Sequence, residues 1–265
     1  MAGSEPFHIS LNPSAPTTLL LLHGLLSSHL EYAHVTPHLP TYHLLIPDLP
    51  GHSRSSHLAP STIPHITNTI ATLIRTHAHN GRAHIIGLSM GGFVALDLAH
   101  RYPELCQSLF VTGAAPFEGA FAFIARRPWI AYGIMWVMDS LPDGVYWWLC
   151  KRNGMVRHEE LRVEMRRNRR WGVVREVYGS ILGIGWETVR EIQGVRCLCV
   201  AGGKQDDLGS TRRVGEVWRA NGIGKAVVVR EALHAWDLQM PEVFARGVRA
   251  WVEEGALPGE FEELD

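Results

Sequence analysis

The sequence predicts an α/β protein with a mostly parallel central sheet, flanked by helices and interrupted by one inserted helical segment. Short apolar runs alternate with longer helix-like stretches along most of the chain, as in a parallel sheet covered on both faces. One long interval, residues 117–190, has no strand-like run. The composition, 46% apolar and 19% charged over 265 residues, is that of a globular protein with a sizeable core.

The expected elements follow one another in a regular order. Residues 7–11 are the sole strand-like piece before the first long apolar run, so the sheet should begin with a short or missing strand. The apolar runs predict strands at residues 17–22, 42–47, 83–87, 108–113, 195–202 and 225–230. Helix-like stretches predict helices at residues 61–79, 90–101, 211–221 and 241–254. The acidic tail after Gly255 is expected to fray.

The interval without strands predicts a separate helical layer. We expect residues 1–116 and 191–265 to form the core, and residues 117–190 to form a helical cap, or lid, between two strands. Six of the nine tryptophans lie in this insertion. Residues 151–175 carry nine basic and three acidic side chains, a difference of about +6. A solvated helix face explains this charge best, and a grip on a substrate carboxylate or phosphate is the alternative.

Charge and composition argue against several partners and compartments. Lys and Arg number 25 against 26 Asp and Glu, so no chain-wide charge favours nucleic acid or an anionic membrane. No apolar run approaches a membrane span, and the first ten residues lack the features of a secretory signal. The four cysteines have no paired Cys-x-x-Cys spacing, which favours buried thiols in a reducing compartment. We therefore expect a cytoplasmic monomer or homodimer with a small-molecule substrate and no cofactor.

The strongest local motif is Gly87-Leu88-Ser89-Met90-Gly91, directly between an expected strand and an expected helix. A serine at the tip of such a tight turn has a strained backbone, and small residues at 87 and 91 let neighbouring chains approach. Its hydroxyl would project at the carboxyl ends of the strands, where ligands bind in such sheets. The Met90 N–H, at the start of the helix, would point to the same place and bind developing negative charge.

A second motif, His23-Gly24-Leu25-Leu26, follows the expected strand at residues 17–22. A turn here would present the Leu25 N–H as a second oxyanion donor beside that of Met90. Leu26 is a candidate for the wall of the substrate pocket. His23 is expected to hydrogen-bond turns rather than to take part in chemistry.

Three segments together point to a known family. HGLLSS at 23–28, DLPGHSRS at 48–55 and GLSMGG at 87–92 resemble, in this order and spacing, the α/β-hydrolase superfamily and its cap-bearing serine hydrolases. The resemblance covers residues 17–116 and 192–254, and it implies an α/β-hydrolase fold in which the 48–55 loop is structural. Haloalkane dehalogenases and epoxide hydrolases of this superfamily use an aspartate in the nucleophile turn, so the serine here argues against those activities.

The resemblance also implies which residues assist Ser89. The family order is serine, acid and then histidine, which maps the histidine onto His234, in the loop before the last expected helix. The acid maps onto Asp206, and Asp207, one residue further on, is the alternative. No metal site is expected, although 15 histidines are present, because their spacing does not place two of them with an acid on one helix face.

These residues predict a serine hydrolase that cleaves a small to medium hydrophobic ester, thioester or lactone through an acyl-serine. The tryptophans of the insertion favour an aromatic or polyketide-like acyl group, with Trp129, Trp136 and Trp147 as candidate contacts. Two alternatives stay open. One is a carbon–carbon bond hydrolase, or a lyase or cyclase, with the same Ser-His-Asp triad, and the other is a ligand receptor with residual hydrolysis.

Overall fold

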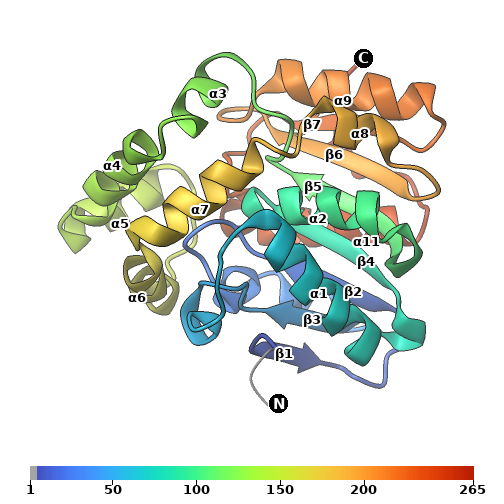
Figure 1. The fold of residues 1–265 in the computed structure, drawn as a ribbon, viewed down its shortest axis with the longest axis horizontal. Helices are drawn as coiled ribbons and strands as arrows, with labels where there is room; N and C mark the ends of the chain where they lie inside the picture. The colour runs from blue at the N-terminus through green and yellow to red at the C-terminus, as the bar shows by residue number, and fades with distance from the viewer. Residues whose placement is uncertain (1–4) are drawn as a thin grey trace.

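The computed structural model describes residues 5–265, so the first four residues of the N-terminal segment considered above lie outside the description. Within this range the strands form one eight-stranded sheet with the order β1-β3-β2-β4-β5-β6-β7-β8 (Figure 1). β1 and β8 pair antiparallel with their neighbours, and the other pairs are parallel. The strands are β1 His8–Leu11, β2 Thr18–Leu22, β3 His43–Pro47, β4 Ala83–Leu88, β5 Cys106–Thr112, β6 Arg196–Gly202, β7 Gly224–Val229 and β8 Glu262–Glu263. The predicted fold class and the mostly parallel sheet are confirmed.

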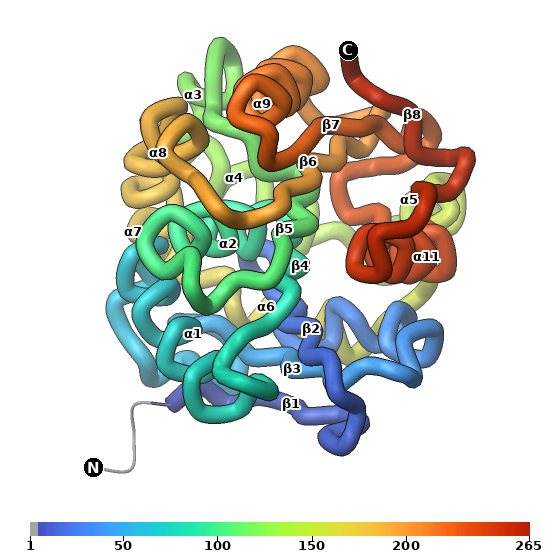
Figure 2. Tube along the Cα trace, turned by 90° about the vertical axis from the view of Figure 1, so that its right-hand side faces the viewer, coloured from blue at the N-terminus to red at the C-terminus, as the bar shows by residue number. Residues whose placement is uncertain are grey.

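Helices cover both faces of this sheet. α1 (Ile63–His77), α2 (Met90–Arg101) and α9 (Leu208–Ala220) lie on one face, and α11 (Pro241–Val252) lies on the other (Figure 2). Side chains along β2 alternate between the two layers, because successive residues of a strand point to opposite faces. The leucines at 20 and 22 join the cluster beneath α1 and α2, and those at 19 and 21 join the cluster beneath α11.

Between β5 and β6 the chain forms a helical insertion, which lies over the carboxyl ends of the strands (Figure 1). Its helices are α3 Gly119–Ala125, α4 Pro128–Asp139, α5 Asp143–Arg152, α6 Glu159–Asn168, α7 Trp171–Ile181 and α8 Trp186–Glu191. α7 packs on α1 and α2 with one side and on α3 and α4 with another. α8 packs on α2 and α9, within the helical layer of the sheet. α10 (Trp236–Gln239) is a single turn before α11.

Buried polar contacts at the end of α6 hold the insertion on the sheet. Asn168 is buried, and its side-chain nitrogen donates to the carbonyl oxygens of Leu26 and Ser27, each at 2.9 Å. Its side-chain oxygen accepts the N–H of Ser53 at 2.7 Å. On α7, Glu176 accepts a backbone N–H from the loop before α1 at 2.7 Å. The inner helices α6 and α7 are therefore tied to the core by specific hydrogen bonds.

The expectation that the tail after Gly255 frays is wrong. β8 pairs with β7, and the Phe261 ring is buried against the sheet. Gly247 on α11 makes room for this ring, because a Cβ there would lie 2.1 Å from it. The carboxylate of Glu262, one of the acidic residues on which the expectation of fraying rested, forms an ion pair with Arg230 at 2.6 Å, next to the end of β7. The short first strand, by contrast, is present as β1 at the opposite edge.

All four cysteines are buried and unpaired. Over residues 5–265, no helix combines the length and the apolar character needed to cross a membrane.

Candidate active site

Ser89 lies at the junction of β4 and α2, in a backbone conformation that few side chains adopt. Its φ is 52° and its ψ is −115°. Its N–H donates to the carbonyl oxygen of Thr112 at 2.8 Å, which ties the turn to β5. A Cβ at Gly87 would lie 2.4 Å from the carbonyl oxygen of Gly91, and a Cβ at Gly91 would lie 2.1 Å from that of Leu22. The turn therefore requires both glycines, and its neighbours maintain the strained serine.

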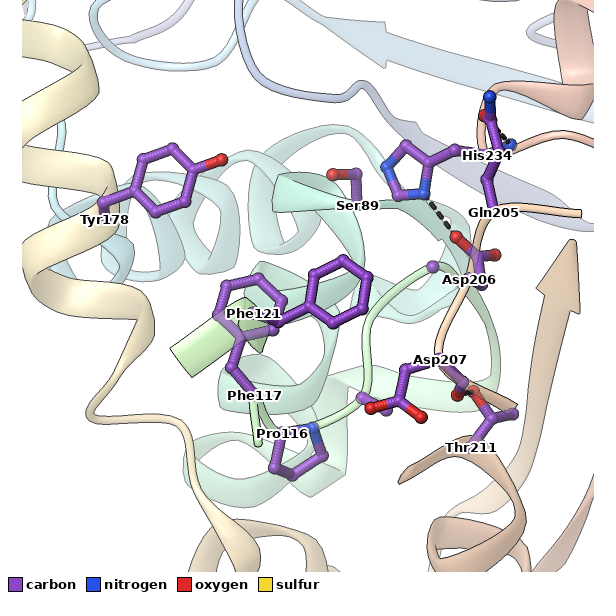
Figure 3. A pocket seen from close by; sticks show the side chains of 12 residues that line it. Ser89, Pro116, Phe117, Phe121, Tyr178, Gln205, Asp206, Asp207, Thr211 and His234 are labelled. Atoms are coloured by element: carbon purple, nitrogen blue, oxygen red, sulfur yellow. Dashed lines mark hydrogen bonds and ion pairs between the residues drawn. The ribbon is translucent and has the colours of Figure 1, made fainter. Parts of the chain in front are cut away.

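Asp206 and His234 come from the loops after β6 and β7. The Asp206 Oδ1 lies 2.5 Å from the His234 Nδ1, and the other carboxylate oxygen accepts the Gly202 N–H at 2.7 Å. Asp207 instead caps α9, because its carboxylate accepts the Ser210 N–H at 3.1 Å. Figure 3 shows the His234 ring between Ser89 and Asp206, with Asp207 apart from it. The structure thus brings Ser89, Asp206 and His234 to one cavity, which Asp207 also lines, but within residues 5–265 the carboxylate bonded to His234 is that of Asp206.

The environment of His234 suits a base that accepts a proton. Burial opposes a charge on the ring, but the hydrogen bond and the charge of Asp206 outweigh it, so the pKa of His234 is raised above 6.5. With its Nδ1–H bonded to Asp206, the neutral ring has a free Nε2 lone pair. Gly113, with a φ of +61°, lies against the ring, since a Cβ there would be 2.5 Å from the His234 Cε1.

Two cavities share Ser89 and His234 in their walls. The smaller, of about 200 Å³, also contains Asp206, and the rings of Phe117, Phe121 and Tyr178 line it (Figure 3). The larger, of about 320 Å³, extends beneath the insertion, where flexible thioethers contribute to its wall. These come from Met135, Met155 and Met165. An acyl chain next to Ser89 would therefore meet apolar and adaptable surroundings.

The two candidate oxyanion donors belong to the larger cavity. Leu25 and Met90 line it together with Ser89, and Met90 is the first residue of α2. The Gly24 N–H before Leu25 donates to the Glu31 carboxylate at 2.6 Å, which fixes the turn after β2. The two N–H groups thus belong to two segments that line the cavity with Ser89, the turn after β2 and the first residue of α2.

A buried pair of acids beneath this turn has no counterpart in the sequence prediction. Glu31 and Asp237 are both buried, and both oxygens of Asp237 are without a hydrogen-bond partner within residues 5–265. Burial raises the pKa of Glu31 to about 7, and burial together with the charge of Glu31 raises the pKa of Asp237 well above its usual range. No local motif marks either residue. Only the position of Asp237, three residues after His234, could have drawn attention to it.

His23 has the structural role expected of it. Its Nε2 accepts the Leu49 N–H at 2.9 Å, so its Nδ1–H donates to the Gly24 carbonyl oxygen at 2.8 Å. Burial lowers the pKa of His23 to about 4 and that of the neighbouring His52 to about 3, and both rings are neutral near pH 7. The 48–55 loop and the turn after β2 are joined through this neutral histidine.

The expected substrate contacts of Leu26, Trp129, Trp136 and Trp147 require correction. All four side chains lie outside the two cavities that contain Ser89. The carbonyl oxygen of Leu26 bonds to the insertion, and 63% of Trp129 and 52% of Trp136 are exposed. On α4 it is Met135, one turn after the buried Ala131, that reaches the larger cavity. The helical phase of α4 therefore turns its tryptophans outward, which residue type alone could not predict.

Of the nine basic residues at 151–175, three pair with carboxylates of neighbouring helices and two pair with glutamates of their own segment. The buried Arg162 and Arg166 both contact Asp143, at 3.1 and 2.9 Å, and Arg169 contacts Asp139 at 2.9 Å. These contacts join α6 to α4 and α5. For these three arginines the partners are protein carboxylates, which favours the structural interpretation over a grip on substrate.

One group of possible metal ligands is formed by residues far apart in the sequence. Glu5, His8 and His77 offer ligand atoms within 4.8 Å of one another, at β1 and the end of α1. The His77 ring already hydrogen-bonds the Glu5 carboxylate. Sequence spacing could not reveal this group, and all three residues lie outside the cavities at Ser89.

The sheet order, together with a strained serine turn at the carboxyl ends of its strands, defines a protein with the α/β-hydrolase architecture. A family model described as the alpha/beta hydrolase fold matches residues 17–142. A Gibberella zeae protein named as an AB hydrolase superfamily protein is 30% identical over 274 aligned positions, which cover 100% of this chain and 89% of that protein. The chain therefore belongs to the α/β-hydrolase superfamily.

Other similarities are more limited. The lipase LipV of Mycobacterium tuberculosis is 33% identical over 103 residues, which span 39% of this chain and 39% of that lipase. A solved structure of a thermophilic esterase from Thermogutta terrifontis has a TM-score of 0.70 at 19% identity, covering 94% of this chain and 93% of that one. The second similarity concerns the fold alone.

Proposed function

We propose that the protein is a serine hydrolase that cleaves a small to medium hydrophobic ester, thioester or lactone through an acyl-serine. One observation carries the proposal. A serine in a strained strand-to-helix turn lines the same cavity as a histidine whose Nδ1 lies 2.5 Å from a buried carboxylate. The name of the related lipase supports hydrolysis of an ester.

In this mechanism the Ser89 Oγ attacks the carbonyl carbon while the His234 Nε2 takes its proton. Asp206 orients the imidazole and stabilises its positive charge. The N–H groups of Leu25 and Met90 bind the oxyanion, and the leaving alcohol or thiol takes the proton from His234. Water then gives a proton to His234 and attacks the acyl-serine, and His234 passes this proton to the Ser89 Oγ as the acyl–oxygen bond breaks and the acid leaves.

We further propose that the helices from α3 to α7 act as a cap that selects the acyl group. They contribute Phe121, Met135 and Tyr178 to the cavities at Ser89. α8 packs on α2 and α9, so the proposed cap ends before it rather than at residue 190. Aromatic and thioether side chains favour a hydrophobic acyl chain over a charged one.

Replacing Ser89 tests the nucleophile. Ser89→Ala should lower kcat on an activated p-nitrophenyl ester by roughly 10⁴- to 10⁶-fold. The exposed Ser56, outside both cavities, provides the matched control Ser56→Ala, which should retain full activity. A fluorophosphonate probe should label the wild-type protein at Ser89 and should leave Ser89→Ala unlabelled. Undiminished turnover by Ser89→Ala would overturn the proposal, and a burst of alcohol release would argue against the lyase and receptor alternatives.

We propose the cytoplasm as the location, because four buried, unpaired thiols suit a reducing compartment. Labelling of these thiols in the freshly isolated protein after unfolding, without reductant, should give four modified cysteines.

A further inference from the structure

The exposed apolar side chains gather on the helical insertion. Of fourteen large apolar side chains exposed within residues 5–265, thirteen lie between Phe121 and Leu182. We use the name outer apolar face for six of them: Trp129, Ile134, Trp136, Val137 and Met138 on α4, and Trp148 on α5. Exposed apolar patches of this kind mark contact sites on soluble domains.

α4 has the composition of a buried helix but the position of a surface helix. It contains no charged residue from Pro128 to Met138, and only Ala131 and Asp139 are buried. It lies at the outer edge of the insertion, beyond α7 from the sheet (Figure 1). A helix that is apolar on all sides belongs in a protein core or against lipid.

Three cations lie close in sequence to the ends of α4 and α5, Arg126 before α4 and Lys151 and Arg152 at the end of α5. Arg126, Lys151 and Arg152 form no ion pair within residues 5–265, and the Arg152 guanidinium lies 5.5 Å from the centre of the Trp148 ring. The carboxylates on these helices, Asp139 and Asp143, are both paired with arginines. Tryptophans next to arginine and lysine are typical of segments that lie at the headgroup level of a membrane, where cations attract anionic lipids.

A third cavity, of about 310 Å³, joins Met138 of this face to His234. Met138, which is 45% exposed, and His234 both belong to its wall. An amphiphilic molecule bound at the outer apolar face could therefore pass its ester group toward His234 without crossing the inner helices.

We propose that the outer apolar face docks the protein on an anionic lipid–water interface, and that the substrate is an amphiphilic ester taken from that interface through the cavity at Met138. This inference rests on the proposed hydrolase function and adds its substrate class. The charges favour lipid over a second copy of the chain, because a symmetric dimer through this face would bring Arg126, Lys151 and Arg152 near their own counterparts. The near-zero net charge predicted no membrane partner, since a sum over the chain hides cations clustered at one place.

Vesicle sedimentation tests the docking directly. The wild-type protein should bind vesicles of phosphatidylcholine with about 30% phosphatidylglycerol at least about tenfold more tightly than pure phosphatidylcholine vesicles, and salt should weaken this binding. Ile134→Asp with Val137→Asp should weaken binding at least about tenfold, because both side chains are more than half exposed and outside the cavities. Lys151→Gln with Arg152→Gln should weaken it about fivefold for each cation removed. Leu11→Asp, at an exposed apolar position on β1, is the matched control and should bind like the wild type.

Activity separates this inference from the proposed function. Both double variants should hydrolyse a soluble short-chain ester as fast as the wild type, and should lose hydrolysis of a long-chain ester in anionic vesicles. If the wild type hydrolyses the soluble ester but binds vesicles no better than Ile134→Asp with Val137→Asp, the docking proposal is wrong and the hydrolase proposal stands. If the wild type hydrolyses no ester, the proposed function fails. A dimer that the aspartate variant abolishes, without vesicle binding, would identify a self-association face and overturn the inference.

Discussion

β2 and α4 are both apolar segments, but they differ in how much of their surface is buried. All five residues of β2 are buried, whereas ten of the twelve residues of α4 retain appreciable exposure. β2 pairs with β3 and β4 and has a helical layer on each face, while α4 packs on α3 and α7. Apolar composition therefore shows what a segment is able to bury, and the number of neighbouring elements determines how much of it is buried.

The largest expected contrast concerns activity at the ends of the core strands. Asp206→Asn should lower kcat by roughly 10⁴-fold, because the imidazole would lose both its orientation and its stabilising charge. The neighbouring Asp207→Asn should keep near wild-type kcat and lower the free energy of unfolding by at most about 1 kcal/mol, since this side chain caps α9. Steady-state kinetics and urea unfolding of the two variants provide the measurement. Equal losses of kcat would contradict the choice of Asp206.

A second contrast concerns stability in the two apolar segments themselves. Leu21→Ala, at a fully buried site on β2, should lower the free energy of unfolding by about 2–5 kcal/mol. Val137→Ala, at a site on α4 that is 55% exposed, should change it by about 0.5 kcal/mol or less. Urea unfolding of both variants without lipid measures the difference. Similar losses of free energy of unfolding in the two variants would show that the Val137 side chain is packed in solution, and would contradict the contrast between β2 and α4.

The smallest contrast concerns pH. Burial raises the pKa of Glu31 to about 7 from 4.5, so the folded protein holds a proton that the unfolded chain releases between these values. This carboxyl therefore makes its full stability contribution below pH 4.5 and loses it as the pH rises through about 7. Glu31→Gln removes the effect, so the free energy of unfolding of the variant minus that of the wild type should increase across this interval.

Two comparisons separate the contribution of Glu31 from those of other titrating groups. The pKa of His23 is lowered to about 4 and that of His52 to about 3, so the contribution of each histidine to the free energy of unfolding increases as the pH rises toward 6.5. Both contributions are present in Glu31→Gln and in the wild type, so they cancel when the two free energies of unfolding are subtracted. Arg162 and Arg166 lower the pKa of Asp143 on the insertion below its usual 3.8. Asp143→Asn should therefore leave the slope between pH 4.5 and 7 as it is in the wild type. A pH-independent difference for Glu31→Gln would show that Glu31 is ionised throughout.

The sequence predicts the sheet well because each buried strand is a short run of consecutive apolar residues. The expected runs at 17–22 and 83–87 match β2 and β4 to within one residue at each end. The serine turn is equally local, since Gly87 and Gly91 are needed for its geometry. His234 and Asp206 required the family resemblance, because their pairing joins two loops that are 28 residues apart.

The remaining features depend on contacts that have no short-range pattern. Glu31 and Asp237 meet only after the turn after β2 and the last loop have come together, and the acids look like ordinary surface residues in the sequence. The outward phase of Trp129 and Trp136 depends on which side of α4 meets α7. The burial of Phe261 depends on a distant glycine, Gly247, so the acidic residues around it led to the wrong expectation.

Gly113 has a consequence for the evolution of this chain. Its φ is positive, and any Cβ at this position would press against the His234 ring, so almost any exchange here would displace the imidazole while leaving the sheet intact. A relative could thus lose turnover through one exchange at this position and still keep its cavities and its helical insertion. Such a protein would bind the ligand without consuming it, so this position offers a short mutational route from an enzyme to a sensor.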